Sequence, residues 1–461
     1  MPSESPRSVE VAIVGAGIAG IATSYALCQQ RIGGRRDRKL ELIDPLPPMS
    51  LTSAQSGDNY RSWWPHPTMA AFTGRSIELM ERLARDSGNA LAMTRRGYAL
   101  ATRSRDIDPL LSELRAGGAG EIRIHDRPRL PRYRPPLSAD WQAAPDGVDV
   151  ITDQSLIRRT FPSFDPTVAA VVHVRRAGDI NGQQLGQLML ERVRERGGRL
   201  LRAGLRGARH DGGWHLDLVG DDGPQSLRAE TVVIAAGPCV GAVAALLGAT
   251  LPLRTVLQQK IAFEDREGAI PRDQPFAVDL DARTLEWTEE ERTLLAEDPE
   301  TSWLTQPMPG SIHCRPDGGD RGRWIKLGWA YNRTASGPCE APELDPRFPE
   351  IVLRGAAALN PGLRAYYGRL PRGFSHCGGY YAITEENWPL VGPLGEGIEG
   401  GFVVGALSGF GTMAACAAGE LCAAWIDGGP LPAYARDLSP ARSGDAALMA
   451  ELTGSARKGV L

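Results

Sequence analysis

Three glycines near the start of the chain, Gly15, Gly17 and Gly20, have the spacing G-x-G-x-x-G. In a turn between a strand and a helix, the first glycine allows a tight bend and the second lets a pyrophosphate approach the backbone. The third allows the helix to pack closely on the strand. The helix N-terminus then offers backbone N–H groups to the anion. The spacing therefore predicts a dinucleotide site at this turn, to which Ile18 and Ala19 also contribute.

The flanking sequence supplies the strand and the helix that such a turn needs. Residues 9–14 are an apolar, β-branched run typical of a strand buried on both faces, and a helical pattern begins at Ile18. Residues 40–43 form a second apolar run, and Asp44 follows it, where a carboxylate can accept hydrogen bonds from ribose hydroxyls. The separation between the glycines and Asp44 is somewhat long, which we attribute to an insertion at residues 33–39. These segments predict a βαβ unit that binds a dinucleotide.

A second strand-turn-helix pattern lies far along the chain, at residues 401–425. Its turn contains Gly409 and Gly411, followed by Thr412 and Met413. Glycines let a backbone pass close to a planar ring, and a helix N-terminus stabilises the negative charge that gathers at the pyrimidine edge of a flavin on reduction. This second turn favours a flavin over a nicotinamide.

The ordered motifs resemble those of the D-amino acid oxidase superfamily of FAD-dependent oxidoreductases, the group that contains sarcosine oxidase and glycine oxidase. The similar segments, in family order and over most of the chain, are VAIVGAGIAG, TSAQSGDNYR, AGDINGQQL, AETVVIAAGP, GSIHCRPDGG, GGYYAITEENWPLVGP and GALSGFGTM. The resemblance implies an α/β protein with a discontinuous Rossmann-like FAD-binding domain and an antiparallel-sheet α+β substrate domain. It also implies that Leu205, Ala236 and Gly237 contribute to the FAD site.

The resemblance predicts how the chain is divided between these domains. We expect the FAD-binding domain to use residues 1–95, 151–250 and 371–440. The substrate domain is expected to use residues 96–150 and 251–370, and residues 441–461 are expected to form a loosely held tail.

The activity that the resemblance implies is oxidation of a carbon–nitrogen bond of an amine or amino acid, by hydride transfer to flavin N5, with molecular oxygen as the expected acceptor. Sarcosine oxidases attach their flavin through a cysteine, and that position corresponds here to Gly379, two residues from Cys377. We therefore expect noncovalent FAD. The alternatives are a flavin-dependent dehydrogenase with another acceptor and a protein that keeps FAD only as a structural ligand.

Several cationic side chains are candidates for work beside the flavin. Related amino-acid oxidases grip the substrate carboxylate with an arginine, and Arg61, Arg315 and Arg372 lie in segments where this is expected. Each is also consistent with a structural arginine, because arginine is abundant in the chain. Lysine is scarce, and Lys260 lies in a strand that resembles the one beside the flavin, where a cation favours electron transfer to oxygen. A surface position is the alternative for Lys260.

Histidines and tryptophans complete the set of candidates. His66, His313 and His376 lie in segments expected near the ring, where a neutral imidazole can bind the flavin or accept a substrate proton, although a structural histidine is more common. The tryptophans of the loop and roof segments are expected to line a pocket for a bulky or aromatic substrate, or else to serve in packing; they are Trp63, Trp64, Trp303, Trp324 and Trp329.

Composition excludes several other classes of protein. The 461 residues contain 52 basic and 55 acidic side chains, a formal charge of -3, which disfavours nucleic acid and anionic membranes as partners. The seven cysteines are scattered without a C-x-x-C pair, which favours a reduced, cytoplasmic chain and disfavours a metal site. Glycines interrupt the apolar stretch at residues 9–27, so we expect no membrane span. The partner we expect is a small-molecule substrate.

Overall fold

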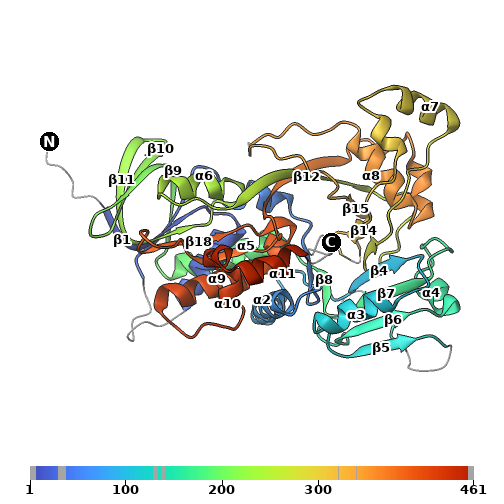
Figure 1. Cartoon of the computed structure of the whole chain (residues 1–461), viewed down its shortest axis with the longest axis horizontal. Helices are drawn as coiled ribbons and strands as arrows, with labels where there is room; N and C mark the ends of the chain where they lie inside the picture. The colour runs from blue at the N-terminus through green and yellow to red at the C-terminus, as the bar shows by residue number, and fades with distance from the viewer. Residues whose placement is uncertain are drawn as a thin grey trace.

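The computed structural model describes residues 7–29, 38–127, 133–136, 141–319, 321–338 and 340–454 (Figure 1). Two large β-sheets lie next to each other, and the chain passes between them several times. The seven-stranded sheet consists of β1 (Arg7–Val14), β2 (Leu40–Asp44), β9 (Arg199–His210), β10 (Trp214–Gly220), β11 (Gly223–Ile234), β17 (Leu390–Pro393) and β18 (Gly401–Gly405). The nine-stranded sheet consists of β4 (Tyr98–Thr102), β5 (Ile122–His125), β6 (Val148–Ile151), β7 (Ala170–Val174), β12 (Leu253–Glu264), β13 (Phe276–Asp279), β14 (Ile312–Asp317), β15 (Trp324–Gly328) and β16 (Ser375–Thr384). A small antiparallel pair, β3 (Asn59–Arg61) and β8 (Ala177–Asp179), lies apart from both.

The seven-stranded sheet has a parallel core with the topology of a dinucleotide-binding fold. Strand β1 pairs in parallel with β2 and with β11, β2 pairs in parallel with β9, and β11 pairs in parallel with β18. Its apolar strands are buried on both faces, as parallel strands between two layers must be. The Rossmann-like fold predicted for the FAD-binding part is therefore confirmed.

Different layers cover the two faces of this sheet. On one face lie α1 (Ile18–Gln29), α5 (Gly182–Glu195) and α9 (Gly411–Asp427), which share a core with Val11, Ile13 and Leu42. On the other face lies α6 (Val240–Leu246), in a core to which the antiparallel strands β9 to β11 of the same sheet also contribute. Helix α2 (Pro67–Asp86) packs against α9 from outside. The glycine-rich turns at the starts of α1 and α9 thus reach the same layer.

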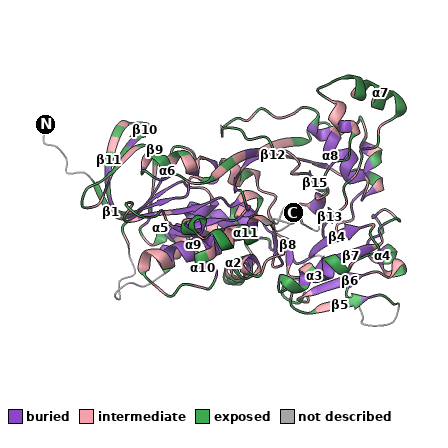
Figure 2. Ribbon diagram, viewed as in Figure 1, coloured by how far each residue is buried: buried purple, intermediate pink, exposed green. Residues whose placement is uncertain are grey.

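Helix α9 is apolar around most of its circumference. The segment Ser408–Asp427 is long and apolar enough to cross a membrane, but 67% of its apolar window is buried inside the protein. A helix between a sheet and an outer helix needs apolar residues on both sides. Figure 2 shows α9 in the buried centre of the molecule.

The nine-stranded sheet is mixed but mainly antiparallel, in the order β16-β12-β15-β14-β13-β4-β7-β6-β5. Helix α8 (Phe348–Ala357) packs on one face. Helix α3 (Asp108–Ala116) supplies Leu110, Leu111 and Leu114 to the opposite face. The short α4 (Gln154–Thr160) and the exposed α7 (Glu289–Glu297), which a Thr288 capping box begins, lie at its periphery. The antiparallel-sheet α+β substrate part agrees with the prediction.

Strand pairing departs from the expected domain ranges at two places. Strand β7 lies in the range 151–250 assigned to the FAD-binding domain, but it pairs with β4 and with β6 in the nine-stranded sheet. Strand β16, which falls in the range 371–440 assigned to that domain, pairs with β12 over ten residue pairs. An apolar run such as that of β7 fits the buried middle of either sheet, so its composition does not show which sheet it joins.

Beyond residue 440 the described chain is helical, and Arg442 and Leu452 are its buried side chains while the others are exposed or half-buried. A 3-10 turn at Pro440–Gly444 follows α10 (Ala435–Leu438) and leads into α11 (Ala446–Gly454). The Nε of the buried Arg442 donates to Glu386 Oε1 at 2.7 Å. Residues 455–461, and residues 33–37 of the predicted insertion, lie outside the described residues.

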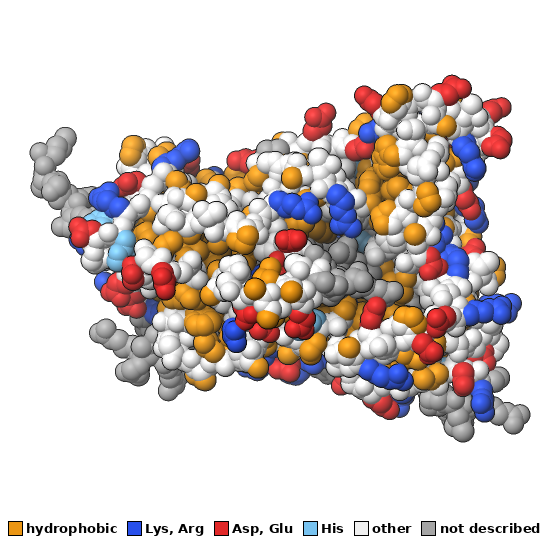
Figure 3. All heavy atoms as spheres, viewed as in Figure 1, with side chains coloured by type: hydrophobic (Ala, Val, Ile, Leu, Met, Phe, Trp, Pro, Cys, Tyr) orange, Lys and Arg blue, Asp and Glu red, His pale blue; other side chains and the backbone are white. Residues whose placement is uncertain are grey.

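The face drawn in Figure 3 mixes acidic and basic side chains without a broad patch of one sign. This distribution is consistent with the small net charge of -3.

Candidate functional site

The first glycine turn has a geometry that two of its glycines make possible. Gly15 has a φ of +115°, and a Cβ placed on it would lie 2.3 Å from the carbonyl oxygen of Ala235. A Cβ on Gly20 would lie 1.9 Å from the carbonyl oxygen of Gly15. Both positions therefore exclude any side chain. Gly17 is partly exposed, and a Cβ on it would make a tight contact of 3.2 Å with Ser53 Oγ.

Asp44 lies beside this turn at the end of β2. Its Oδ2 accepts the N–H of Ala16 at 2.7 Å, and its Oδ1 accepts the N–H of Leu46 at 2.8 Å. These bonds fix the carboxylate, and each oxygen keeps a lone pair with which to accept a hydroxyl. On the helix side of the turn, the N–H of Ile18 donates to Ser53 Oγ at 3.0 Å.

The remaining residues predicted for this end of the site lie around the same turn. Ala236 Cα lies 2.9 Å from the Cβ position of Gly15, and Gly237 follows with a φ of +54°. Leu205, on β9, follows Gly204, whose Cβ position is nearest to Pro45, the residue after Asp44. The structure thus brings Ala236, Gly237 and Leu205 to the region of Gly15 and Asp44.

The second glycine turn contacts both sheets. A Cβ on Gly409 would lie 2.6 Å from the ring of Tyr381 on β16, so this close approach also requires glycine. Thr412 Oγ1 donates to Ser56 Oγ at 2.8 Å. The Sδ of Met413 accepts the backbone N–H of Arg61 at 3.3 Å. These contacts join the start of α9 to the loop that leads into β3.

A channel connects the two turns. Ile18 of the first turn and Gly409, Gly411 and Thr412 of the second line it, with Lys260 of β12. The first and second glycine turns, nearly 400 residues apart in the sequence, therefore meet at one space that glycines line. These residues fit FAD: the turn at Gly15–Gly20 would hold its diphosphate, and Lys260 and the start of α9 would border its ring.

A larger cavity of about 640 Å³ continues from this channel. The residues that border both spaces are Ser56, Gly57, Gln258, His313, Ala330, Tyr381, Ser408, Gly409 and Thr412. A volume of this order holds a small organic substrate. The arrangement therefore places a substrate-sized space at the end of the channel where a flavin ring would lie.

Aromatic side chains form one wall of the cavity. The rings of Tyr98 and Phe276 are stacked with centroids 4.3 Å apart, and Phe276 stacks in turn on His313 at 4.9 Å. Trp63 and Phe410 also line the space. Such a wall contacts planar or apolar groups favourably.

Backbone strain is concentrated around the cavity. Asp58, Ser311, Asn387 and Ser408 have φ values of +59°, +74°, +60° and +47°, and all four line it. Non-glycine residues in this region cost energy and occur most often where function requires them. The loops around the cavity are therefore held in place by the surrounding structure.

Lys260 lies on β12 and lines the channel. Its Nζ donates to the carbonyl oxygen of Ser56, and it pairs across the strands with Cys377 of β16. Burial lowers the pKa of Lys260 to about 8. The amine is therefore mostly protonated at neutral pH and loses its charge as the pH rises through 8.

The three histidines have different positions. His313 lines both the channel and the cavity, and burial lowers its pKa to about 4, so its imidazole is neutral. His376 stacks on Phe348, bonds Gln259 Oε1 at 2.9 Å and borders a separate small pocket with Cys377. His66 is not in the cavity, contrary to the expectation. It caps helix α2 by accepting the N–H of Thr68 at 3.2 Å.

The structure does not bring the three predicted arginines into the cavity. Arg61 is buried, its Nε donates to the carbonyl oxygen of Trp63 at 3.2 Å, and its guanidinium stacks on Trp64 at 4.4 Å. Burial lowers the pKa of Arg61 to about 10. Arg372 is exposed on a turn outside the cavity lining.

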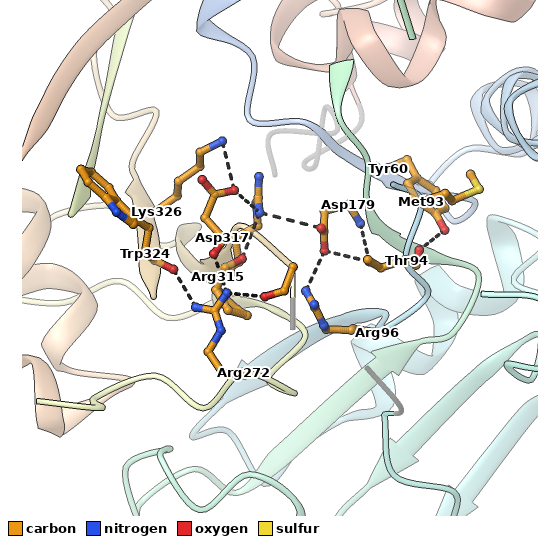
Figure 4. A network of polar contacts seen from close by, with 12 residues as sticks. Tyr60, Met93, Thr94, Arg96, Asp179, Arg272, Arg315, Asp317, Trp324 and Lys326 are labelled. Atoms are coloured by element: carbon orange, nitrogen blue, oxygen red, sulfur yellow. Dashed lines mark hydrogen bonds and ion pairs between the residues drawn. The ribbon is translucent and has the colours of Figure 1, made fainter. Parts of the chain in front are cut away.

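Arg315 belongs to a polar network between the nine-stranded sheet and the loop before β3 (Figure 4). It donates to the carbonyl oxygen of Gly57 and to Asp317 Oδ1, each at 2.9 Å. Asp179 lies 3.9 Å away and joins it to Arg96. Arg315 thus holds the Gly57 carbonyl and lines neither the channel nor the cavity.

Two arginines that the sequence interpretation missed do line the cavity. Arg254 lies on the same face of β12 as Lys260, and its Nη1 donates to the carbonyl oxygen of Arg333 at 3.0 Å. Both side chains are exposed at the cavity. The alternation of β12 was the available signal, because residues an even number apart share a face of a strand.

The five predicted tryptophans divide between the site and other places. Trp63 lines the cavity and Trp329 lines the channel. Trp64 packs against Phe410 and Arg61, Trp303 packs on Tyr331, and Trp324 is 41% exposed.

Comparisons with known proteins agree with this site. The family model described as FAD dependent oxidoreductase matches residues 10–425. The chain therefore belongs to this family and is an FAD-dependent oxidoreductase. A search of curated proteins gives no significant match.

Solved structures show the same fold at low sequence identity. L-Proline dehydrogenase from P. horikoshii is 16% identical with a TM-score of 0.70, and the similarity covers 96% of this chain and 99% of that one. Glycine oxidase from Geobacillus kaustophilus is also 16% identical with a TM-score of 0.70, covering 95% and 99%. Iminodiacetate oxidase from Chelativorans sp. BNC1 is 18% identical with a TM-score of 0.67, covering 94% and 99%.

Proposed function

We propose that this FAD-dependent oxidoreductase oxidises a carbon–nitrogen bond of a bulky amine or amino acid, with molecular oxygen as the electron acceptor. The observation that carries the proposal is the continuity between the cavity of about 640 Å³ and the channel that Ile18, Lys260 and Thr412 line. The names of the similar structures support it, since glycine oxidase, iminodiacetate oxidase and proline dehydrogenase are named for nitrogen-containing substrates.

Bound FAD would supply the chemistry, by accepting a hydride equivalent at N5. The protein's own contribution is then to bind and orient the substrate. Arg254 and Arg333 are the cations of the cavity, and a guanidinium binds a carboxylate through two parallel hydrogen bonds. The stacked rings of Tyr98 and Phe276 are suited to contact an aromatic or apolar substrate side chain. Together they favour an amino acid with a large side chain.

The proposed oxidation does not require a strong base in the cavity. His313 is neutral because burial lowers its pKa to about 4, so it can bond a substrate but is a weak proton acceptor. A neutral amine needs no proton removed before hydride departure, since its own lone pair assists the step. Lys260, when protonated, provides a cation beside the channel that can stabilise reduced oxygen species.

An anaerobic screen of amino acids and amines tests the proposal. The purified protein should be yellow, and a substrate should remove the flavin absorbance at about 450 nm. Air should then restore the colour with release of one peroxide for each substrate oxidised. Bleaching by hydroxy acids but by no amine would contradict the proposed substrate class. Bleaching by an amine without peroxide on reoxidation would contradict oxygen as the acceptor and favour a dehydrogenase.

A further inference from the structure

Gln258 occupies the junction of the channel and the cavity. It lines both spaces and lies on the face of β12 that carries Lys260 and Arg254. Its partner across the strands on β16 is Gly379, which has no side chain. No side chain of β16 therefore lies beside Gln258; the atom nearest to the Cβ position of Gly379 is Gln55 Cβ, at 3.1 Å.

The orientation of the Gln258 amide is fixed by its neighbour. Its Nε2 donates to the backbone carbonyl oxygen of Asn332 at 2.8 Å. A carbonyl oxygen can only accept, so this contact identifies the amide nitrogen and leaves Oε1 on the other side. The residue whose carbonyl determines this orientation, Asn332, is itself held by hydrogen bonds.

Asn332 is held by two hydrogen bonds of its own. Its Nδ2 donates to the carbonyl oxygen of Leu257 at 2.8 Å, and its Oδ1 accepts the N–H of Thr334 at 3.0 Å. These bonds tie the segment after β15 to β12 beside the junction. Asn332 is thus a positioning residue that holds the Gln258 amide in one rotamer.

The Oε1 of Gln258 has no hydrogen-bond partner in the described part of the chain, although the residue is only 8% exposed. A buried acceptor without a donor is costly, and such atoms are uncommon in folded proteins. An acceptor that is held in a fixed direction at a substrate cavity is suited to a donor that arrives with the ligand. The ligand group that matches it is an N–H.

We propose that Gln258 Oε1 accepts a hydrogen bond from the nitrogen of the substrate, which makes Gln258 the residue that selects primary and secondary amines. This inference rests on the proposed amine oxidation. It assigns no proton transfer to Gln258, since an amide is neither an acid nor a base in this range. The contact orients the nitrogen, and with it the carbon–nitrogen bond, at the channel end of the cavity.

The test compares Gln258→Met, which keeps the length but removes the acceptor, with Gln258→Glu, which keeps an acceptor oxygen. The probes are the amino acid that bleaches the flavin fastest in the anaerobic screen and the acid that differs from it only by loss of nitrogen. For phenylalanine, that acid is 3-phenylpropanoate. Its binding is read from the shift in the flavin spectrum, which requires no turnover.

We expect Gln258→Met to raise the KM of the amino acid about ten- to a hundredfold, while the Kd of the nitrogen-free acid changes less than about twofold. Gln258→Glu should restore most of the amino-acid KM, because a protonated carboxyl can donate to Asn332 and still accept from the amine. The control is Gln187→Met, at an exposed glutamine of α5 that lines neither space, which should alter neither value.

Three results would overturn the inference. The first is an equal loss of affinity for both probes in Gln258→Met. The second is loss of FAD without a change in the ratio of the two affinities, which would assign Gln258 to the flavin. The third is a wild-type protein that no amine bleaches, which would also remove the proposed function. Should Gln258→Met fail to fold, two substrates of the wild-type protein test the inference instead. The N,N-dimethyl form of the substrate has no N–H to donate, so its kcat/KM should be at least about tenfold lower than that of the N-methyl form.

Discussion

Lys260 and Ser56 lie 204 residues apart in the chain, and the Nζ of the lysine donates to the carbonyl oxygen of the serine. The hydroxyl of the same serine accepts from Thr412 at the start of α9. Three segments, β12, the loop before β3 and α9, thus meet at one residue. This arrangement holds a cation next to the channel in a fixed position.

Replacing this cation should affect the oxidative half of the reaction. We expect Lys260→Met to slow reoxidation of the reduced protein by oxygen about a hundredfold, with a much smaller effect on anaerobic bleaching by the amine. Stopped-flow measurements separate the two steps. Lys326→Met, which removes a lysine that pairs with Asp317 outside the channel, is the matched control. Equal slowing by both variants would contradict a specific role.

The same reaction step should depend on pH. Burial lowers the pKa of Lys260 to about 8, so the side chain loses its charge as pH rises through that value. Reoxidation should therefore be fastest below pH 8 and should slow above it, and the dependence should disappear in Lys260→Met. A wild-type rate that rises through this range would show that the protonated amine is not the active form.

The first glycine turn predicts that Gly17→Val loses FAD. A side chain at this partly exposed position would enter the space expected for the diphosphate, with its Cβ only 3.2 Å from Ser53 Oγ. The variant should fold but be purified without yellow colour. Gly74→Ala on α2, where a Cβ meets no atom within 4 Å, should keep its FAD. A fully yellow Gly17→Val protein would place the diphosphate elsewhere.

The cavity arginines predict a selective effect on substrates that carry a carboxylate. Arg254→Met and Arg333→Met should each raise the KM of an amino acid about tenfold and leave the KM of the corresponding decarboxylated amine nearly unchanged. Arg372→Met removes an exposed arginine outside the cavity and should have no effect. Steady-state kinetics measure the KM of both substrates. An equal rise in KM for the amino acid and the amine would show that these arginines do not bind the carboxylate.

FAD should be released from the denatured protein. Gly379 occupies the position that corresponds to the attachment cysteine of sarcosine oxidases, and Cys377 borders a separate small pocket. Acid precipitation should leave the yellow colour in the supernatant for the wild type and for Cys377→Ser alike. A yellow pellet in the wild type that becomes colourless in Cys377→Ser would demonstrate a covalent bond at this cysteine.

The buried ion pair between Arg442 and Glu386 predicts that loss of the arginine lowers the stability of the protein. Arg442 and Glu386 form an ion pair in which both side chains are at most 4% exposed. Arg442→Met leaves a buried carboxylate without its partner, and should lower the free energy of unfolding by about 3–5 kcal/mol. Urea denaturation measures this value. The double variant with Glu386→Gln should recover part of the loss, and no recovery would indicate that the cation matters mainly through its bonds to backbone carbonyls.

The sequence predicted the parts of the site that depend on local backbone geometry. Close contacts within one turn exclude any side chain at Gly15 and Gly20. Because both positions must be glycine, their spacing can be recognised in the sequence. Lys260 was selected because a single lysine in an alternating strand stands out, and it lines the channel. The Rossmann-like core followed from these features with little ambiguity.

The arginine assignments failed for a physical reason. Arg61 and Arg315 are held by backbone carbonyls and neighbouring side chains that come from other segments, and nothing local in the sequence shows this burial. Arg254 was missed although its even spacing from Lys260 placed it on the same face. His66 precedes Pro67, and a proline at the first position of a helix is a signal that would have indicated a capping role.

Anaerobic mixing of the yellow protein with the best amine of the screen, followed by analysis of the product, tests the account most directly. We predict that one equivalent of amino acid bleaches one equivalent of flavin and yields one equivalent of the imine or its hydrolysed keto acid. Flavin that stays oxidised in the presence of every amine and amino acid, while another class of substrate reduces it, would contradict carbon–nitrogen oxidation in this cavity.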